Sequence, residues 1–449
     1  MNKKISVGMA VSLMAIAATI AVMLTYSLAL NKFESRMAAI TDRTATYDLI
    51  NEVDNTIRRN YYAEIDDDKL RYSIASGLIE GLGDENCRYY TKAEWELEQD
   101  RAAGYDFGLG MDVTRTSEGA MRVTRVQPAS PAYKGGLRIG DIVLKVGGDS
   151  VADVGYDKAR DSIAALASEV SLTIERDGKK LENAVVLTKE RYNISTAEYR
   201  ALEDKIGEII VYGFNALTPE QFNAALVKLQ KENAKGIIID LRESTGGSYE
   251  AAADILDTLV GSGRLMIVTD KNGEQNVRYK SDNSAIDMLY TVLVGDQTEG
   301  AAELFASAMY DFTECDVVGE QTAGQRTFLE DFQLSDGSAI RLSTGVWTTP
   351  GGKLLDENGG VIPNFQTKLT SYQRNNLRLL TLEEDPQMQT ALSRMRSRIE
   401  ILEEDEQPQN VKDVSATDNA VSKTDSGEQK ADDAEKKSEE SSDIEDEDE

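Results

Sequence analysis

Apolar and polar residues follow several distinct patterns along this chain, and the first is an uncharged run at residues 5–30 that follows Lys3 and Lys4. A helix rises about 1.5 Å per residue, so a helix of this length would exceed the ~30 Å hydrocarbon core of a bilayer. We therefore expect a transmembrane signal anchor at 5–30, after a cytoplasmic stub at 1–4. Cleavage of the run as a signal peptide near the small residues at 27–29 is the alternative.

The charges around this run set the expected orientation. The basic start favours an amino terminus in the cytoplasm, although Lys32 and Arg36 weaken the asymmetry. The sequence therefore predicts a single-pass protein of the cell membrane, with the bulk of the chain extracytoplasmic.

Three further stretches have the pattern of helices or of unfolded chain. Residues 31–98 carry apolar residues three and four apart, which predicts a helical amino-terminal region. The same spacing predicts a last helix at 386–403, through Met388, Leu392, Met395, Ile399 and Leu402. This helix is too short for a sustained heptad repeat, so packing on the chain's own core is favoured over a coiled coil. Residues 404–449 are acidic and contain no aromatic residue, which predicts a disordered acidic tail.

Residues 191–385 have the pattern of a layered α/β core. An apolar strand at 206–212 precedes an amphipathic helix at 218–232. The continuous apolar run at 236–242 is typical of a strand that is covered on both faces. The sequence therefore predicts a sheet with helices on both sides in this part of the chain.

The composition limits the chemistry that this fold can carry. The 449 residues include 79 acidic and 49 basic side chains, a formal charge of −30, and no histidine. The absence of histidine excludes Ser–His, Cys–His and His–metal mechanisms. The negative charge argues against nucleic acid as a partner. Cys87 and Cys315 stand in no metal-binding or CxxC spacing, so we expect no metal site and no cofactor.

A glycine-rich loop near the start of residues 99–190 is a candidate peptide-binding site. Its members are Gly108, Leu109, Gly110 and Met111. Such a loop lets consecutive backbone N–H groups converge on one anion. Further matching stretches follow at 130–132, 135–137 and 139–148, with a helix expected at 156–166. The region resembles a PDZ domain, which implies that an extended peptide adds as a strand beside the loop. A purely structural PDZ domain is the alternative.

A second set of residues carries a wider resemblance. Six of them stand without a gap in one frame: Glu303, Asp311, Gly319, Glu320, Thr322 and Gly324. Matching stretches lie at 82–89, 334–344, 348–352 and 360–363. On these residues the chain resembles the C-terminal processing (tail-specific) serine peptidases over residues 48–395. The resemblance implies a helical segment, a PDZ domain and an α/β peptidase-like core of the crotonase/ClpP type, in that order.

The positions that carry catalysis in these peptidases are substituted in this chain. The resemblance places Gly300 at the nucleophilic serine, Gln325 at the general-base lysine and Leu329 at the polar residue that supports the lysine. Glycine has no nucleophile and a glutamine amide is not a base, so no catalytic residue is intact. A possible oxyanion hole remains, built from the backbone N–H groups of three small residues: Gly246, Gly247 and Ala301.

These substitutions predict a family member that has lost its chemistry and acts by binding. Its PDZ domain would capture protein C-termini or unstructured polypeptide. Its core would serve as a scaffold or regulator, as a homodimer or beside an active homologue. One alternative is an active serine-type endopeptidase that uses Thr298 as a substitute nucleophile, while Ser307 bonds within its helix. The other alternative is a structural surface protein whose PDZ groove is blocked.

Overall fold

The amino acids from 7 to 405 are described by the computed structural model, apart from 166–168, 283–284 and 357–359. The predicted stub at 1–4 lies outside the described residues, and so does the predicted acidic tail apart from its first two residues. Met1–Glu400 makes up one unit of the chain, and the elements below belong to it.

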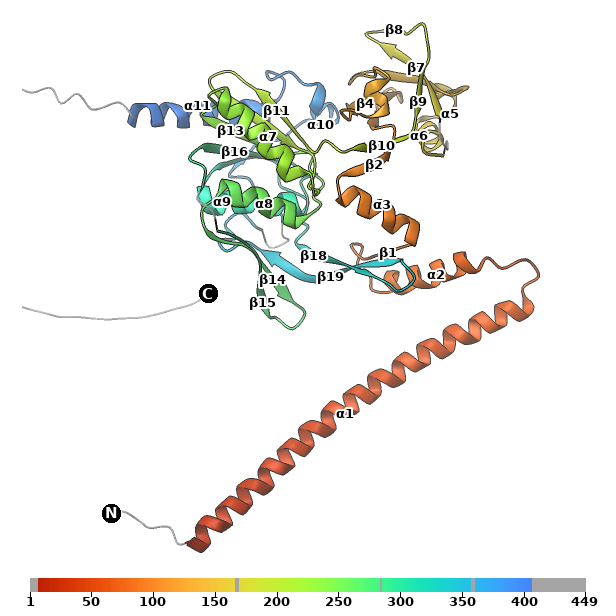
Figure 1. The fold of residues 1–449 in the computed structure, drawn as a ribbon, viewed down its shortest axis with the longest axis vertical. Coiled ribbons are helices and arrows are strands. Elements are labelled where there is room, and N and C mark those ends of the chain that lie inside the picture. The colour runs from red at the N-terminus through yellow and green to blue at the C-terminus, as the bar shows by residue number, and fades with distance from the viewer. Residues whose placement is uncertain (1–6, 166–168, 283–284, 357–359, 406–449) are drawn as a thin grey trace, which may run out of the picture. The chain divides into compact units, whose positions relative to one another are not determined.

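The first helix corrects a prediction from the sequence. In the part of the chain that the structure describes, no helix is long and apolar enough to cross a membrane. The predicted membrane-spanning segment at 5–30 is therefore contradicted, and the single-pass membrane localisation with it. The apolar run is not a separate element, because α1 (Val7–Asn60) continues without a break through Lys32 and Arg36 into a charged segment (Figure 1).

Two shorter helices follow in the region where the sequence predicts helical structure. They are α2 (Asp67–Glu80) and α3 (Lys92–Ala102), separated by the short strand β1 (Arg88–Tyr90). Thr91 and Glu94 form a capping box at the start of α3, which satisfies backbone N–H groups that have no partner within the helix. No side chain of α2 is buried.

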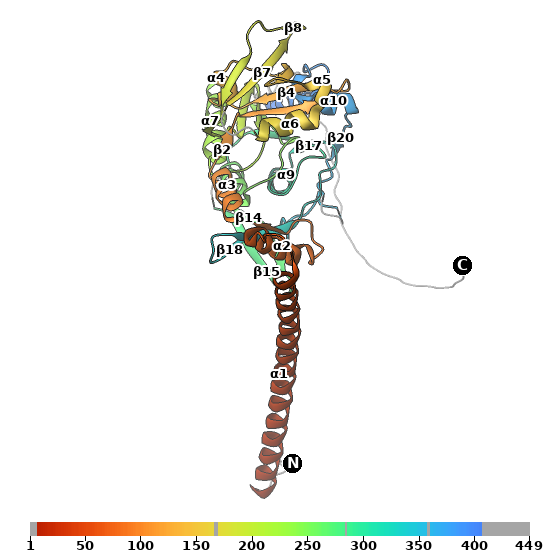
Figure 2. The same ribbon diagram turned by 90° about the vertical axis from the view of Figure 1, so that its right-hand side faces the viewer.

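The next part of the chain forms a small β domain with short helices. Its sheet has the order β3 (Met111–Arg115), β4 (Met121–Val126), β5 (Ile142–Val146), β7 (Glu169–Arg176) and β8 (Lys179–Lys180), with β6 (Asp149–Ser150) on β5 and β9 (Val185–Thr188) on β7. The helices are α4 (Pro131–Lys134), α5 (Val151–Val154) and α6 (Tyr156–Ala165) (Figure 2). Met121, Val123, Leu172 and Ile174 are completely buried in its core. Because β3 pairs only with β4, one edge of β3 is open to an added strand.

Two strands that flank this β domain in the sequence pair with each other in antiparallel fashion. β2 (Tyr105–Gly108) precedes it, β10 (Glu190–Asn193) follows it, and the two strands pair with each other. This ribbon brings the start and the end of the domain together before the chain enters the α/β core.

The α/β core has a six-stranded sheet that is covered on both faces. The strand order is β11 (Ala197–Ala201), β12 (Ile206–Val211), β13 (Gly236–Asp240), β16 (Leu289–Val294), β17 (Asp316–Gly319) and β20 (Phe365–Gln366). All pairs from β12 to β20 are parallel. Helices α7 (Thr218–Lys231), α8 (Tyr249–Leu259) and α9 (Ala301–Thr313) share one apolar cluster with the sheet.

The last helix, α11 (Pro386–Asp405), packs against the sheet through a separate cluster. Met388, Leu392, Met395 and Ile399 lie in this cluster with Ile206 and Ile238 of the sheet. The prediction that this helix packs on the chain's own core is therefore confirmed. The predicted strand at 236–242 and helix at 218–232 also form, as β13 and α7, with slightly shorter bounds.

A second sheet stands beside the first and carries part of the candidate site. It consists of β1, β14 (Gly263–Asp270), β15 (Gln275–Ser281), β18 (Thr327–Gln333) and β19 (Ala339–Thr348). Its buried residues Met266, Phe328 and Trp347 pack with Leu304 of α9. A short helix α10 (Ser371–Asn375) and a 3-10 turn at Leu377–Leu379 precede α11.

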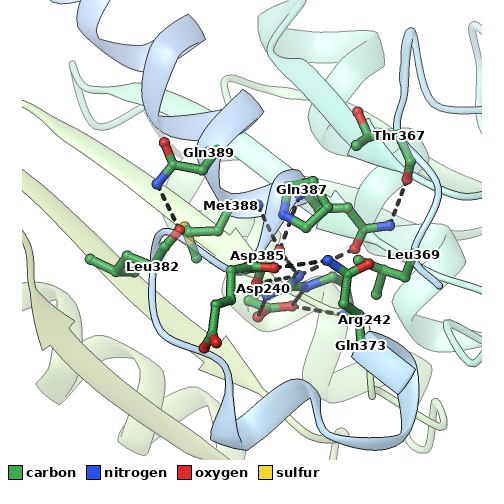
Figure 3. A network of polar contacts seen from close by, with 12 residues as sticks. Asp240, Arg242, Thr367, Leu369, Gln373, Leu382, Asp385, Gln387, Met388 and Gln389 are labelled. Carbon is green, nitrogen blue, oxygen red and sulfur yellow. Dashed lines mark hydrogen bonds and ion pairs between the residues drawn. The ribbon is translucent and has the colours of Figure 1, made fainter. Parts of the chain in front are cut away.

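A buried ion network joins the end of β13 to the start of α11 (Figure 3). The Arg242 guanidinium donates to Asp240 at 3.0 and 2.9 Å and to Asp385 at 3.0 and 2.7 Å. Burial raises the pKa of Asp240, but the charge and hydrogen bonds of Arg242 outweigh this effect and lower that pKa to about 2. Asp385 in turn accepts from the N–H groups of Gln387 and Met388, so the network fixes the first turn of α11.

We expect Arg242→Met to destabilise the protein strongly, because it removes the cation that the buried carboxylates of Asp240 and Asp385 share. Removing one partner of such a network costs roughly 3–5 kcal/mol. Urea unfolding of the full chain at pH 7, followed by circular dichroism, measures the loss. Arg71→Met is the matched control: the Arg71–Asp68 pair is exposed, and breaking it costs about 1 kcal/mol or less.

The difference in the free energy of unfolding between Arg242→Met and the unaltered protein also depends on pH. A carboxyl whose pKa is lowered on folding stabilises the protein above its ordinary pKa of 3.8 and stops doing so as the pH falls through about 2. The two proteins should therefore converge in stability as the pH is lowered across this window. Equal stabilities at pH 7 would contradict the proposed role of Arg242.

Candidate functional site

The structure gathers five residues of the predicted catalytic site around one cavity of about 880 Å³. Gly247, Gly300, Ala301, Gln325 and Leu329 all line it. The loops after β13 and β16 meet here because the carboxyl ends of neighbouring parallel strands lie at the same edge of a sheet. These five residues, far apart in sequence, thus lie at one place in the fold, whereas the predicted peptide-binding residues 108–111 do not line this cavity.

Gly300 stands at the start of α9 and faces the side chain of Gln325. Its φ of +54° and ψ of −109° are a conformation that non-glycine residues rarely adopt. A Cβ atom added there would lie 3.1 Å from Oε1 of Gln325 and 3.5 Å from the Tyr249 hydroxyl. Positions 300 and 325 are therefore apposed as a nucleophile and a base would have to be, although neither group is present.

Gln325 is held by hydrogen bonds on both its backbone and its side chain. Its Nε2 donates to Oδ1 of Asn86 at 2.9 Å, and its carbonyl accepts from Nε1 of Trp347 at 3.2 Å. Asn86 is held in turn by Asp84, which accepts from both its backbone and its side-chain amide. Sequence reasoning did not assign Asn86 to the site. It lies inside the matched stretch at 82–89, but nothing in that stretch indicates which residue reaches Gln325.

Glu303 ties the two halves of the site together. Its completely buried carboxylate accepts from the backbone N–H groups of Gly300 at 2.9 Å, Gly324 at 2.7 Å and Gln325 at 2.8 Å. It also accepts from the Thr322 hydroxyl. Burial raises the pKa of Glu303, and these hydrogen bonds oppose that shift. Thr322 and Gly324, which share a motif with Glu303 in the sequence, thus bond directly to its carboxylate.

Gly246 and Gly247 are glycines because the backbone of other segments approaches them closely. Both have positive φ, +79° and +114°. A Cβ on Gly247 would collide with the carbonyl of Phe214, and one on Gly246 would lie 2.8 Å from the carbonyl oxygen of Glu299. Phe214 donates its N–H to the Gly246 carbonyl at 2.8 Å, which fixes the turn.

The predicted oxyanion hole keeps free hydrogen-bond donors. In the part of the chain that the structure describes, the N–H groups of Gly247 and Ala301 donate to no protein acceptor. Both residues line the cavity. A Cβ on Gly246 would come within 3.4 Å of the Ala301 nitrogen, so the two loops that carry the donors are adjacent. A carbonyl oxygen of a bound ligand can accept from this region.

The hydroxyl groups named as substitutes for the missing serine are engaged in structural hydrogen bonds. Thr298 is completely buried, and its Oγ1 donates to the Leu241 carbonyl at 2.8 Å and accepts from the Gly295 N–H at 2.9 Å. Ser307 is buried and shares a 3.1 Å hydrogen bond with the Thr349 hydroxyl rather than bonding within its helix. Neither residue lines the cavity.

The glycine loop at 108–111 leads into β3 and is fixed by hydrogen bonds from a neighbouring turn. Gly110 has a φ of +72°, and its carbonyl accepts from the Gln127 N–H at 2.8 Å and the Ser130 hydroxyl at 3.2 Å. The loop leads directly into the open edge of β3. One acceptor on this edge is occupied by the protein itself, because the Tyr156 hydroxyl of α6 donates to the Val113 carbonyl at 2.9 Å.

Comparisons with known proteins agree with this architecture. Residues 205–367 match the model of Peptidase family S41, and residues 100–175 match that of the PDZ domain. The "Probable CtpA-like serine protease" of Staphylococcus aureus (strain COL) is 26% identical over 336 residues, 73% of this chain and 66% of the relative. The carboxy-terminal processing protease CtpA of Bacillus subtilis (strain 168) is 27% identical over 330 residues, 73% of this chain and 70% of the relative.

The chain is therefore similar to the C-terminal processing peptidases, and its matches are to a PDZ domain followed by an S41 core. The matched part spans 66% of the length of the S. aureus relative. Among solved structures, a protein assigned to the S41 proteases from Bacteroides fragilis NCTC 9343 has a TM-score of 0.51 and 18% identity, covering 65% of this chain and 83% of that chain. At this identity the likeness concerns the fold alone.

We expect Glu303→Gln to loosen the site, because an amide NH₂ cannot accept the hydrogen bonds that one of the carboxylate oxygens accepts. Leaving buried N–H groups unpaired should cost roughly 2–4 kcal/mol. Urea unfolding measures the loss, and hydrogen exchange should quicken at the amides of Gly300, Gly324 and Gln325. Glu314→Gln, at the exposed far end of α9, is the matched control. Unchanged exchange at the three amides would contradict this role of Glu303.

Proposed function

We propose that this chain binds the carboxyl-terminal segments of other proteins without cleaving them, and acts as a scaffold or regulator. The observation that carries the proposal is the pairing at the former catalytic positions. Gly300 offers no nucleophile, and Gln325 faces it with an amide that is hydrogen-bonded to Asn86. A neutral amide in this position cannot take up the proton that a serine hydroxyl would release.

The rest of the cavity supplies no replacement for the base used by the family. Among the described residues that line it there is no lysine, and the chain has no histidine. The hydroxyl of Tyr249 near Gly300 donates to the Thr327 carbonyl at 3.3 Å, and burial raises the pKa of this tyrosine, so the hydroxyl stays protonated. Acyl transfer needs a nucleophile and a proton acceptor together, and positions 300 and 325 hold neither.

The PDZ domain is the proposed point of capture for the carboxyl terminus. The glycine loop at 108–111 is placed beside the open edge of β3, which suits a strand that ends in a carboxylate. A homodimer, or pairing with an active homologue, is part of the same proposal. α2 buries no side chain and exposes Ile74 and Leu78. Sedimentation that detects only monomer at high concentration would argue against the dimer.

We expect the unaltered chain to leave an unstructured protein substrate intact, and the double variant Gly300→Ser, Gln325→Lys to cleave it. The variant restores the missing groups to positions that Glu303 already fixes, so its rate should rise from background by at least about a hundredfold. Mass spectrometry of the substrate after incubation measures both proteins. Cleavage by the unaltered chain would overturn the proposal, and loss of that cleavage in Thr298→Ala would identify the nucleophile.

We expect the unaltered chain to bind a peptide with a free carboxyl terminus and to lose about tenfold or more in affinity when the terminus is amidated. The amide removes the charge that converging N–H groups stabilise. Fluorescence anisotropy measures both affinities. Tyr156→Phe frees the Val113 carbonyl and should tighten binding severalfold. Equal affinity for the free and amidated peptides would favour a blocked PDZ groove and a structural role.

A further inference from the structure

The cavity around Gly300 contains a carboxylate that no part of the described protein neutralises. Glu299 immediately precedes Gly300, lines the cavity and is half-buried. In the part of the chain that the structure describes, its side chain forms neither an ion pair nor a hydrogen bond, and its burial raises its pKa. Its backbone is fixed, because its N–H donates to the Ser244 carbonyl at 3.1 Å and its carbonyl accepts from Ala302 at 3.1 Å.

The cationic side chains that line the cavity are committed to other acids. Arg88 pairs with Glu94 at 3.2 Å, Arg101 with Asp106 at 3.3 Å, Arg278 with Glu330 at 3.2 Å and Arg341 with Asp331 at 2.7 Å. The cavity therefore holds an unpaired negative charge next to Gly300 and no unpaired positive charge among its described lining residues. A cation supplied by a ligand would remove this imbalance.

Glu299 also lies beside the two free backbone donors. The residue stands two positions before Ala301, and its carbonyl oxygen is 2.8 Å from the position of a Cβ on Gly246, next to Gly247. The N–H groups of Gly247 and Ala301 can hold a carbonyl oxygen, while the carboxylate can pair with an ammonium or guanidinium group. A polypeptide with a lysine or arginine presents both groups together.

We propose that the cavity holds an extended polypeptide uncleaved, and that Glu299 selects a lysine or arginine side chain close to the residue whose carbonyl lies at Gly247 and Ala301. This inference rests on the proposed binding function and adds the class of ligand. A carboxylate in this place is also poorly suited to catalysis, because a negative charge beside the oxyanion hole destabilises the anionic intermediate of acyl transfer. The same negative charge destabilises a neutral carbonyl group much less.

The test uses the full chain and three unstructured peptides that differ at one central position, which is lysine, norleucine or glutamate. All three carry an amidated carboxyl terminus, so that the PDZ domain contributes little. Fluorescence anisotropy at low ionic strength should show the lysine peptide binding about five- to tenfold more tightly than the norleucine peptide, and the glutamate peptide binding most weakly.

Glu299→Gln keeps the size of the side chain and should abolish this preference, whereas Glu314→Gln, the same charge change outside the cavity, should retain it. Glu299→Lys should reverse the order of the lysine and glutamate peptides. Equal affinities of the three peptides for the unaltered chain would overturn the role of Glu299, whether or not the variants fold.

Comparison with the binding of the free and amidated peptides described under the proposed function separates this inference from the function on which it rests. Binding of free carboxyl termini at the PDZ domain, without any lysine preference, would overturn the inference and leave the proposed function standing. Cleavage of the peptides, detected by mass spectrometry, would overturn the proposed function.

Discussion

The candidate site depends on one buried carboxylate. Glu303 lies in the first turn of α9, the helix that follows β16 in the chain, and accepts hydrogen bonds from the loop at 322–325 as well as from Gly300. Three of these donors are backbone N–H groups, which would be unpaired and costly in the interior without it. The contacts involve neither a nucleophile nor a base. The geometry of the site therefore depends on neither a nucleophile nor a base, because it is maintained by the requirement to satisfy buried polar groups.

The sequence predicts this geometry well where spacing along the chain determines it. Gly300 and Gln325 face each other because both follow the ends of adjacent parallel strands, β16 and β17, and the frame from Glu303 to Gly324 has no gap. The contact of Asn86 with Gln325 is different. It joins residues far apart in the chain, and only the folded arrangement decides which polar side chain at 82–89 makes it. The Tyr156–Val113 contact was missed for the same reason. At residues 5–30, hydropathy alone predicted a membrane helix that the structure does not support.

The residues at the two substituted positions, Gly300 and Gln325, also change the free-energy cost of burying the site. A serine–lysine dyad requires an amine that is desolvated and held neutral, which is unfavourable for a group that is charged in water. Gln325 and Asn86 instead form a hydrogen bond between two neutral amides. Leu329, at the position of the polar support, needs no partner at all. The three changes are consistent with one another, since each removes a charge or a polar demand that only catalysis would justify.

Glu299 is the exception to this trend, because it adds a charge where the others remove one. A carboxylate in the same cavity as Gly247 and Ala301 raises the energy of an oxyanion at those donors, but it can be neutralised by a cationic ligand. The donors themselves remain in place because close backbone contacts with Phe214 and Glu299 fix their loops. A site that keeps its hydrogen-bond donors, loses its nucleophile and acquires an unpaired carboxylate favours a bound neutral carbonyl with an adjacent cation over a tetrahedral anion. This arrangement supports the proposal that the site retains polypeptide rather than cleaving it.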